Sequence, residues 1–239
     1  MSRILVADPL HAAGLEILRQ SGSEVHLLTA EERPRLGEIL GGFDALIVRS
    51  MTNVDGDLLR QGKRLKVVGR AGIGVDNVDV STATELGILV VNAPTANLVS
   101  ATEHTFALLL ALARNIPTAH ASLVAGEWDR KRFQGTELNE KTLGLIGLGR
   151  IGQHVAYRAK AFGMKILAFD PYLDAAAARR LDVELSEIVP LLRRSDVVSI
   201  HTPLTDETRG LLDAAAISRM MSGALLVNCA RGGVVDEAA

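Results

Sequence analysis

Short apolar runs rich in β-branched residues alternate with stretches of helical periodicity along nearly the whole chain. In the first part, five apolar runs predict strands at residues 4–7, 25–28, 45–48, 66–68 and 88–91. A second series predicts strands at residues 143–146, 166–169, 197–200 and 224–227. Strands that alternate with helices are typical of parallel sheets covered by helices, so the predicted fold class is α/β.

The two series of strands are separated by residues 97–114, whose apolar positions approximate helical spacing. We place the domain boundary at the start of this helix, which predicts a first domain at residues 1–96 and a second at 97–239. An earlier helix, predicted at residues 12–20, ends at Ser21 and Gly22 because glycine readily takes the left-handed conformation that terminates helices.

Composition narrows the classes of partner. Hydrophobic residues make up 48% of the 239 residues, enough for a real core, and 26 Lys and Arg stand against 28 Asp and Glu. This balance disfavours a broadly basic nucleic-acid-binding protein and favours a small-molecule partner. The longest apolar stretch, at residues 106–113, is too short to cross a bilayer, so no membrane role is predicted. The single cysteine, Cys229, suits a reducing compartment, and we expect a cytoplasmic protein.

A glycine motif opens the second series of strands. Gly147, Gly149 and Gly152 match G-x-G-x-x-G between a predicted strand and a helix at residues 153–162, the setting that dinucleotide-binding sites require. Gly147 would permit the tight turn, Gly149 would let backbone N–H groups approach a pyrophosphate, and Gly152 would let the helix pack close to the strand. The alternative is a purely structural turn with three glycines.

An acidic residue ends the next predicted strand. Asp170 lies eighteen positions beyond Gly152, near the spacing expected for the acid that binds the adenosine ribose. A carboxylate there accepts hydrogen bonds from the ribose hydroxyls and repels the additional phosphate of NADP, which predicts NAD as the cofactor. The alternative is that Asp170 caps a helix before Pro171.

Polar residues follow the last two predicted strands. Thr202 and Arg231 stand at the carboxyl ends of these strands, where open parallel sheets bind ligands. The guanidinium fork of Arg231 suits a carboxylate, so we assign it a substrate role. His201 is a candidate general base, but we favour a role in shaping its loop because residue type alone does not name a base. Cys229 we interpret as part of the cofactor wall rather than a nucleophile.

The segment at residues 125–138 carries charged residues around Trp128, the only tryptophan. It is either a solvated excursion or a subunit contact, since an amphipathic tryptophan beside arginine is typical of interfaces.

As a set, these residues resemble the D-isomer-specific 2-hydroxyacid dehydrogenases, most closely their phosphoglycerate dehydrogenase branch. The resemblance covers nearly the whole chain and implies two parallel-sheet domains, Rossmann-like or flavodoxin-like, the second an incomplete dinucleotide-binding domain. It also implies a homodimer or homotetramer without a metal. The matching segments are residues 48–50, 69–79, 92–94, 103–104, 133–138, 147–152, 169–172 and 228–236.

The resemblance also implies a set of site residues. Around NAD, beside the glycines and Asp170, it places Arg150, Ile151, Thr202, Pro203, Cys229, Ala230 and Arg231. Arg231 would also bind the carboxylate and keto oxygen of the substrate. For the phosphate and carboxylate end of a phosphorylated 2-hydroxy acid, it implies Arg49, Ser50, Gly72, Ile73 and Gly74, with Asn97 at the hinge between domains.

The activity that the resemblance implies is the NAD-dependent oxidation of D-3-phosphoglycerate to 3-phosphohydroxypyruvate, the first step of serine biosynthesis. Two alternatives stay open: a hydroxypyruvate or glyoxylate reductase, and a non-catalytic module that senses NAD(H). Family members continue beyond the Arg-Gly-Gly turn to a catalytic glutamate and histidine, whereas this sequence ends at Ala239. We therefore expect a C-terminally truncated chain that binds NAD with little turnover, because general acid–base catalysis contributes about 10²- to 10⁴-fold in rate.

Overall fold

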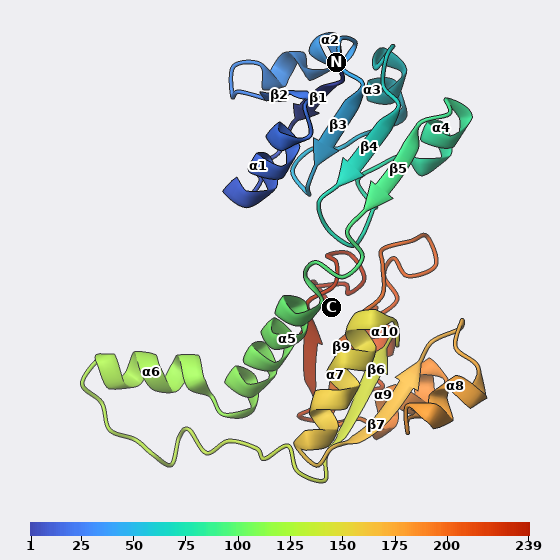
Figure 1. The fold of residues 1–239 in the computed structure, drawn as a ribbon. Coiled ribbons are helices and arrows are strands. Elements are labelled where there is room, and N and C mark those ends of the chain that lie inside the picture. Colours follow the sequence, from blue (N-terminus) through green and yellow to red (C-terminus); the bar gives the residue numbers. More distant parts are fainter. The chain divides into compact units, whose positions relative to one another are not determined.

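The computed structural model describes residues 1–239 and divides into two compact units, Met1–Asn97 and Leu98–Ala239 (Figure 1). The division follows Asn97, one residue beyond the boundary placed from the sequence. Both units are built on five-stranded sheets in which every pair of neighbouring strands is parallel. The predicted α/β class with parallel sheets is confirmed.

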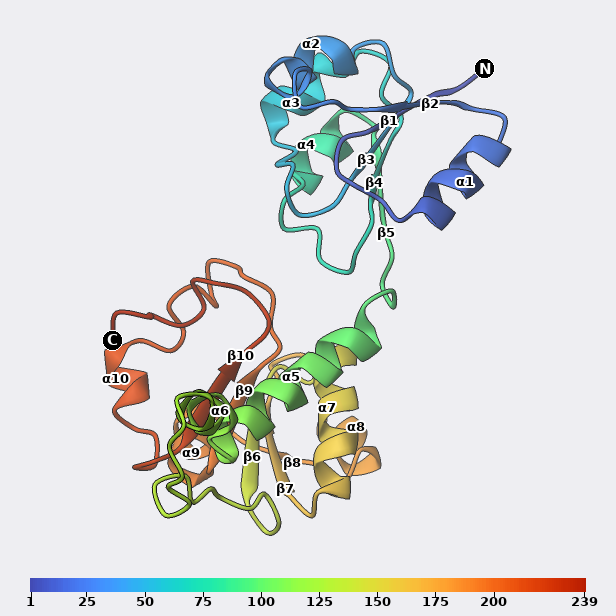
Figure 2. The ribbon, with the colours of Figure 1, turned by 90° about the vertical axis from the view of Figure 1, so that its left-hand side faces the viewer.

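The sheet of the first unit has the order β2-β1-β3-β4-β5. Its strands are β1 (Arg3–Val6), β2 (Glu24–Leu27), β3 (Ala45–Val48), β4 (Val67–Arg70) and β5 (Leu89–Asn92), each within two residues of its prediction. The helices are α1 (Ala12–Gln20), α2 (Leu36–Leu40), α3 (Gly56–Gln61) and α4 (Val80–Glu85), with a 3-10 turn, η1 (Arg33–Arg35), before α2. Figure 2 shows α1 on one side of this sheet and the other three helices on the opposite side, where the buried core of the unit lies.

The sheet of the second unit has the order β10-β9-β6-β7-β8. Its strands are β6 (Thr142–Ile146), β7 (Lys165–Phe169), β8 (Glu184–Leu185), β9 (Val197–Ile200) and β10 (Leu225–Asn228). Its helices are α5 (Leu98–Ala113), α6 (Ile116–Val124), α7 (Arg150–Ala161), α8 (Ala175–Arg180), α9 (Ile188–Arg194) and α10 (Ala214–Ile217). Among these strands only β8 was not predicted, because two residues form no apolar run. The helix α5 packs against α7 and β10, and two apolar clusters fill the interior.

No single helix has the length and apolar character needed to cross a membrane. The pair α5 and α6, bent by 62° at the break between them, passes that test by length and composition only.

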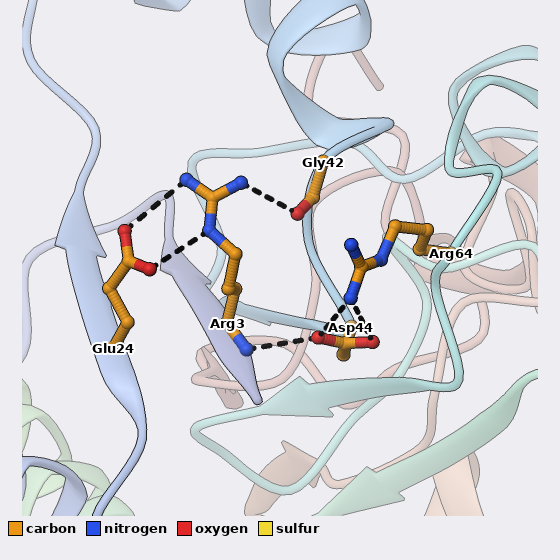
Figure 3. Close-up of polar contacts among 5 residues, drawn as sticks. All are labelled: Arg3, Glu24, Gly42, Asp44 and Arg64. Carbon is orange, nitrogen blue, oxygen red and sulfur yellow. Dashed lines mark hydrogen bonds and ion pairs between the residues drawn. The ribbon is translucent and has the colours of Figure 1, made fainter. Parts of the chain in front are cut away.

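The amino-terminal edge of the first sheet is joined by polar contacts centred on Arg3 (Figure 3). The Arg3 guanidinium donates to both carboxylate oxygens of Glu24 and to the carbonyl of Gly42, while the backbone N–H of Arg3 donates to the Asp44 carboxylate at 3.0 Å. Arg64 donates to the same Asp44 carboxylate. The Arg3 amide, with Arg64, holds the pKa of Asp44 below its ordinary value. These contacts connect β1, β2 and the turn before β3.

The strand orders also determine where ligands can be bound. In the first unit the chain reverses direction across the sheet between β1 and β3, and in the second between β6 and β9. At such switch points, neighbouring loops leave the sheet toward opposite faces and open a crevice outside the carboxyl ends of the strands. The candidate residues of each unit are found at that edge.

Candidate functional site

The glycine motif forms the turn from β6 into α7, at the switch point of the second unit. Gly147 has a φ of 95°, and a Cβ there would lie 2.8 Å from the carbonyl oxygen of His201. A Cβ on Gly152 would collide with the carbonyl oxygen of Gly147. By contrast, a Cβ on Gly149 would meet no atom within 4 Å. The protein's own packing therefore requires the two outer glycines, whereas the middle one faces open space.

The first turn of α7 is not capped by a side chain, and its N-cap residue is Gly149. The first N–H groups of a helix have no partner within the helix, and together with the peptide dipole they make a site for an anion. The side-chain N–H of Gln153 donates to the carbonyl of Leu148 at 3.0 Å, which connects the first turn of α7 to the glycine turn. Arg150 and Ile151 lie in this first turn, so their N–H groups belong to the candidate anion site.

Asp170 lies beside the glycine turn. Its Oδ2 accepts the N–H of Leu148 at 2.8 Å and its Oδ1 accepts the N–H of Tyr172 at 3.0 Å. The alternative role as a helix cap is wrong, because α8 begins at Ala175 and is capped by Asp174. Two backbone N–H groups thus orient the Asp170 carboxylate, and each oxygen keeps a lone pair for a further donor.

The loop after β9 contributes a buried hydroxyl. The Oγ1 of Thr202 is buried and has no hydrogen-bond partner within the protein. Buried polar atoms without partners are rare and costly, so this hydroxyl favours a ligand that supplies one. Pro203 follows as an exposed residue of the same loop.

His201 comes directly before Thr202 and directly after β9. Its ring Nε2 is 3.0 Å from the hydroxyl of the buried Ser199. Burial lowers the pKa of His201 to about 4, so the imidazole is neutral at neutral pH. The sequence-based preference for a loop-shaping role agrees with this environment, because the carbonyl of His201 lies against Gly147.

The turn after β10 presents Arg231. Asn228 shapes it, accepting the N–H of Ala230 at 3.0 Å and donating to the carbonyl of Arg231 at 2.8 Å. The Arg231 guanidinium itself donates to the carbonyl of Ala230. Cys229 is a half-buried free thiol in this turn. Asn228 was not identified from the sequence, although asparagine before a glycine-rich segment is a recognisable turn signal.

The first unit has a pocket of about 520 Å³ beside the carboxyl ends of its strands. Arg49 and Arg70 both line it, after β3 and at the end of β4. Arg70 was not among the predicted site residues, although it stands in the segment 69–79. A Cβ on Gly72 would overlap the Arg70 guanidinium, so a side chain there would displace the end of this flexible arginine. The sequence thus predicted Arg49 at this edge, but it did not identify Arg70 as a second arginine of the pocket.

The other predicted residues of the first unit are Ser50 and the segment 72–74, which follow strands of the sheet, and Asn97, which ends the unit. Ser50 is exposed in the loop after β3. The carbonyls of Gly72 and Ile73 accept hydrogen bonds from the N–H of Ala93 and the side chain of Asn92, which joins the segment before Gly74 to the end of β5. Asn97 is exposed at the end of the unit.

Comparison with known proteins connects these geometries to a family. Residues 106–239 match the model of the D-isomer specific 2-hydroxyacid dehydrogenase NAD binding domain. The chain belongs to this family. A D-3-phosphoglycerate dehydrogenase from Methanocaldococcus jannaschii is 52% identical over the whole chain, which spans 46% of that relative's length. The chain thus spans about half the length of such relatives.

Two solved structures support the family fold over both units. The TT0316 protein from Thermus thermophilus matches with a TM-score of 0.88 at 36% identity, covering 98% of this chain and 75% of that one. A D-lactate dehydrogenase from Aquifex aeolicus, complexed with NAD and lactic acid, matches with a TM-score of 0.87 at 30% identity, covering 98% and 70%. The predicted 2-hydroxyacid dehydrogenase resemblance and the predicted NAD cofactor are confirmed.

The residues predicted to bind NAD fit this cofactor on structural grounds. The uncapped start of α7, the open space over Gly149, the oriented carboxylate of Asp170 and the unpartnered hydroxyl of Thr202 all stand at the carboxyl edge of one sheet. The role of each single residue toward NAD or substrate stays a prediction.

Proposed function

We propose that this chain takes part in the NAD-dependent oxidation of D-3-phosphoglycerate to 3-phosphohydroxypyruvate, the first step of serine biosynthesis. The observation that carries the proposal is the second unit's switch point, where an uncapped helix start, an oriented carboxylate and an unpartnered buried hydroxyl occur together. The high identity to D-3-phosphoglycerate dehydrogenases supports the choice of substrate.

In this proposal, different groups of the second unit bind different parts of NAD. The first N–H groups of α7 bind the diphosphate, Asp170 accepts the adenosine ribose hydroxyls, and Thr202 bonds the nicotinamide half. Arg150, Ile151, Pro203, Cys229 and Ala230 complete the wall around it. When bound, NAD accepts a hydride from the hydroxyl-bearing carbon of the substrate.

Arginines bind the two anionic ends of the substrate in this proposal. Arg231, held by its Asn228-shaped turn, binds the carboxylate and the developing keto oxygen. A guanidinium matches a carboxylate with two parallel hydrogen bonds. The phosphate end is held from the first unit by Arg49, Ser50 and the segment Gly72, Ile73 and Gly74, with Asn97 at the hinge.

The removal of the hydroxyl proton is not assigned to His201. Its pKa of about 4 makes it a poor proton acceptor at neutral pH, and its Nε2 is engaged by Ser199. In this proposal His201 supports the glycine turn, which its carbonyl contacts.

Calorimetric titrations of the 239-residue chain test the cofactor and substrate assignments. We expect NADH to bind more tightly than NADPH, because the Asp170 carboxylate repels a 2′-phosphate. Arg231→Lys should weaken 3-phosphoglycerate binding in the presence of NADH by about tenfold, since the second parallel hydrogen bond is lost. Arg219→Lys, an exposed arginine in the same unit, is the matched control. Equal affinity of the two cofactors, or an Arg231→Lys variant that binds like the parent, would contradict the assignment.

We further propose that the chain forms a homodimer or homotetramer through α6 and the segment after it. Trp128 is 76% exposed and Val124 73%, beside the exposed Ile116 and Leu123. A pocket of about 290 Å³ lies between Leu123 and Trp128. Large apolar side chains exposed around a pocket are typical of association surfaces. Light scattering should show an oligomer that Trp128→Ser shifts toward the monomer, and a monomeric parent chain would refute this part.

A further inference from the structure

The loop that follows β3 is held by a side chain from the end of β1. Residues 49–52 leave the sheet at the first unit's switch point, next to Asp8. One carboxylate oxygen of Asp8 accepts the N–H of Arg49 at 2.6 Å and the N–H of Thr52 at 3.2 Å. The other accepts the hydroxyl of Thr52 at 2.6 Å. Both ends of the loop are thereby bound to a single carboxylate.

Asn77 holds the same two residues through their other backbone groups. Its Nδ2 donates to the carbonyl of Arg49 at 2.7 Å and to the carbonyl of Thr52 at 2.6 Å. The N–H and the C=O of both Arg49 and Thr52 are therefore occupied by two side chains from outside the loop. Ser50 and Met51, which lie between these residues, are exposed, as is Arg49 itself.

Asp8 and Asn77 together form a clamp on the 49–52 loop. The Asp8 carboxylate of this clamp is buried and ionised. Asp8 is 2% exposed, and Arg33 lies 3.6 Å from its Oδ1 and also donates to the Thr52 hydroxyl at 3.1 Å. Burial alone would raise the pKa of Asp8, but the hydrogen bonds from Thr52 and Arg49, with the charge of Arg33, hold it below its ordinary value. Hydrogen bonds to an ionised acceptor are stronger than neutral ones, so the clamp is stiff.

A buried charge is expensive, and its contribution to stability alone does not explain its presence. The buried Asp8 carboxylate instead fixes the conformation of the 49–52 loop. Two exposed residues of this loop, Arg49 and Ser50, are among the predicted anion-binding residues. A loop ordered before binding loses less conformational freedom when a ligand arrives, which raises affinity without any new contact.

We propose that Asp8 and Asn77 are positioning residues, which hold the 49–52 loop in the conformation that presents Arg49 and Ser50 to the anionic end of the substrate. This inference rests on the proposed function of the first unit. Neither residue need touch the substrate, because each acts through the backbone of the loop.

Paired variants of the 239-residue chain test the inference by calorimetric titration with 3-phosphoglycerate. Asn77→Ala removes two hydrogen bonds from the loop and should weaken binding by about tenfold. Asn53→Ala, at an exposed asparagine next to the loop, is the matched control and should bind like the parent. Thr52→Val should also weaken binding, whereas Thr52→Ser, which keeps the hydroxyl bonded to Asp8, should restore it. NADH affinity should be unchanged in all four.

Amide hydrogen exchange separates positioning from general stability. In Asn77→Ala we expect faster exchange at Arg49 and Thr52, while the amides of β3 and β4 keep their protection. Unchanged 3-phosphoglycerate affinity in Asn77→Ala, or an affinity loss accompanied by equal loss of protection throughout the first unit, would overturn the inference.

Arg49→Ala separates this inference from the function on which it rests. If Arg49→Ala abolishes 3-phosphoglycerate binding while Asn77→Ala leaves it intact, only the positioning role fails. If Arg49→Ala has no effect on binding, the substrate assignment of the first unit fails, and the positioning role fails with it.

Discussion

At the carboxyl edge of each sheet, the loop at the switch point is held in a fixed conformation, but by different interactions in the two units. In the second unit the loop at the switch point is shaped by glycines, and two of them lie so close to neighbouring carbonyls that no side chain fits. In the first unit the corresponding loop is shaped by two side chains that bind its backbone, the buried Asp8 and the half-buried Asn77. A diphosphate that is bound by N–H groups needs close approach of the backbone, which excludes side chains. An exposed guanidinium needs only that the loop carrying it be held still.

Replacement of the glycines should have the largest effect and tests whether backbone packing shapes the second edge. Gly152→Ala places a Cβ against the carbonyl of Gly147. We expect the free energy of unfolding to fall by about 3 kcal/mol, and the free energy of NADH binding to weaken by about the same amount. Gly149→Ala meets no protein atom, so it should fold like the parent and yet bind NADH more weakly. Urea unfolding and NADH titration measure the two effects. A Gly152→Ala variant as stable as the parent would show that the turn is not shaped by this contact.

Acid should weaken the second unit before the first. His201 has a folded-state pKa of about 4 against an ordinary value of 6.5. The unfolded chain therefore binds its proton first, and stability that is complete above pH 6.5 falls by about 2 kcal/mol by pH 5. The pKa of Asp8 is lowered below 3.8, so the stability it contributes is lost only at still lower pH.

Hydrogen exchange at pH 7.5 and pH 5 measures this difference through the amides of β6 and β3. We expect protection to fall at β6 and to persist at β3, and His201→Gln should remove the pH dependence at β6. Equal loss of protection in both sheets would contradict the assignment to His201.

The charge of Asp170 should have an intermediate effect. Asp170→Asn removes the repulsion of a 2′-phosphate and weakens the acceptor for the ribose, so NADH should bind about tenfold more weakly and the preference over NADPH should narrow. Asp206→Asn, at an exposed position of the same unit, is the control. An unchanged ratio of the two cofactor affinities would remove Asp170 from the specificity assignment.

The amino-terminal edge of the first sheet should respond least. Arg3→Met deletes the exposed hydrogen bonds to Glu24 and the part-buried one to Gly42, and should cost about 1 kcal/mol in the free energy of unfolding. Binding of 3-phosphoglycerate should not change, because this edge lies at the opposite ends of the strands. Urea unfolding and the same titration measure both, and a variant that folds normally but loses the ligand would contradict the division between the two edges.

Much of the architecture could be predicted because it depends on local patterns. Apolar runs located nine of the ten strands, and the two-residue β8 escaped because its pairing with β7 comes from tertiary contact. The glycine motif and Asp170 were found because their spacing reflects one continuous β-α-β segment, formed by β6, α7 and β7. Asp8, Thr52 and Asn77 carried no such signal, since more than 20 residues separate each partner from the next along the chain.

The sequence by itself determined the α/β class, the two series of strands and the place of the glycine turn, since these follow from periodicity and from residues close together in the chain. Only the tertiary structure decided that Asp170 binds the turn rather than caps a helix, that desolvation lowers the pKa of His201 and keeps it neutral, and that Asp8 and Asn77 hold one loop from both sides. The physical reason is that burial and hydrogen bonding between distant segments arise only when the sheets assemble and bring the carboxyl ends of non-consecutive strands together.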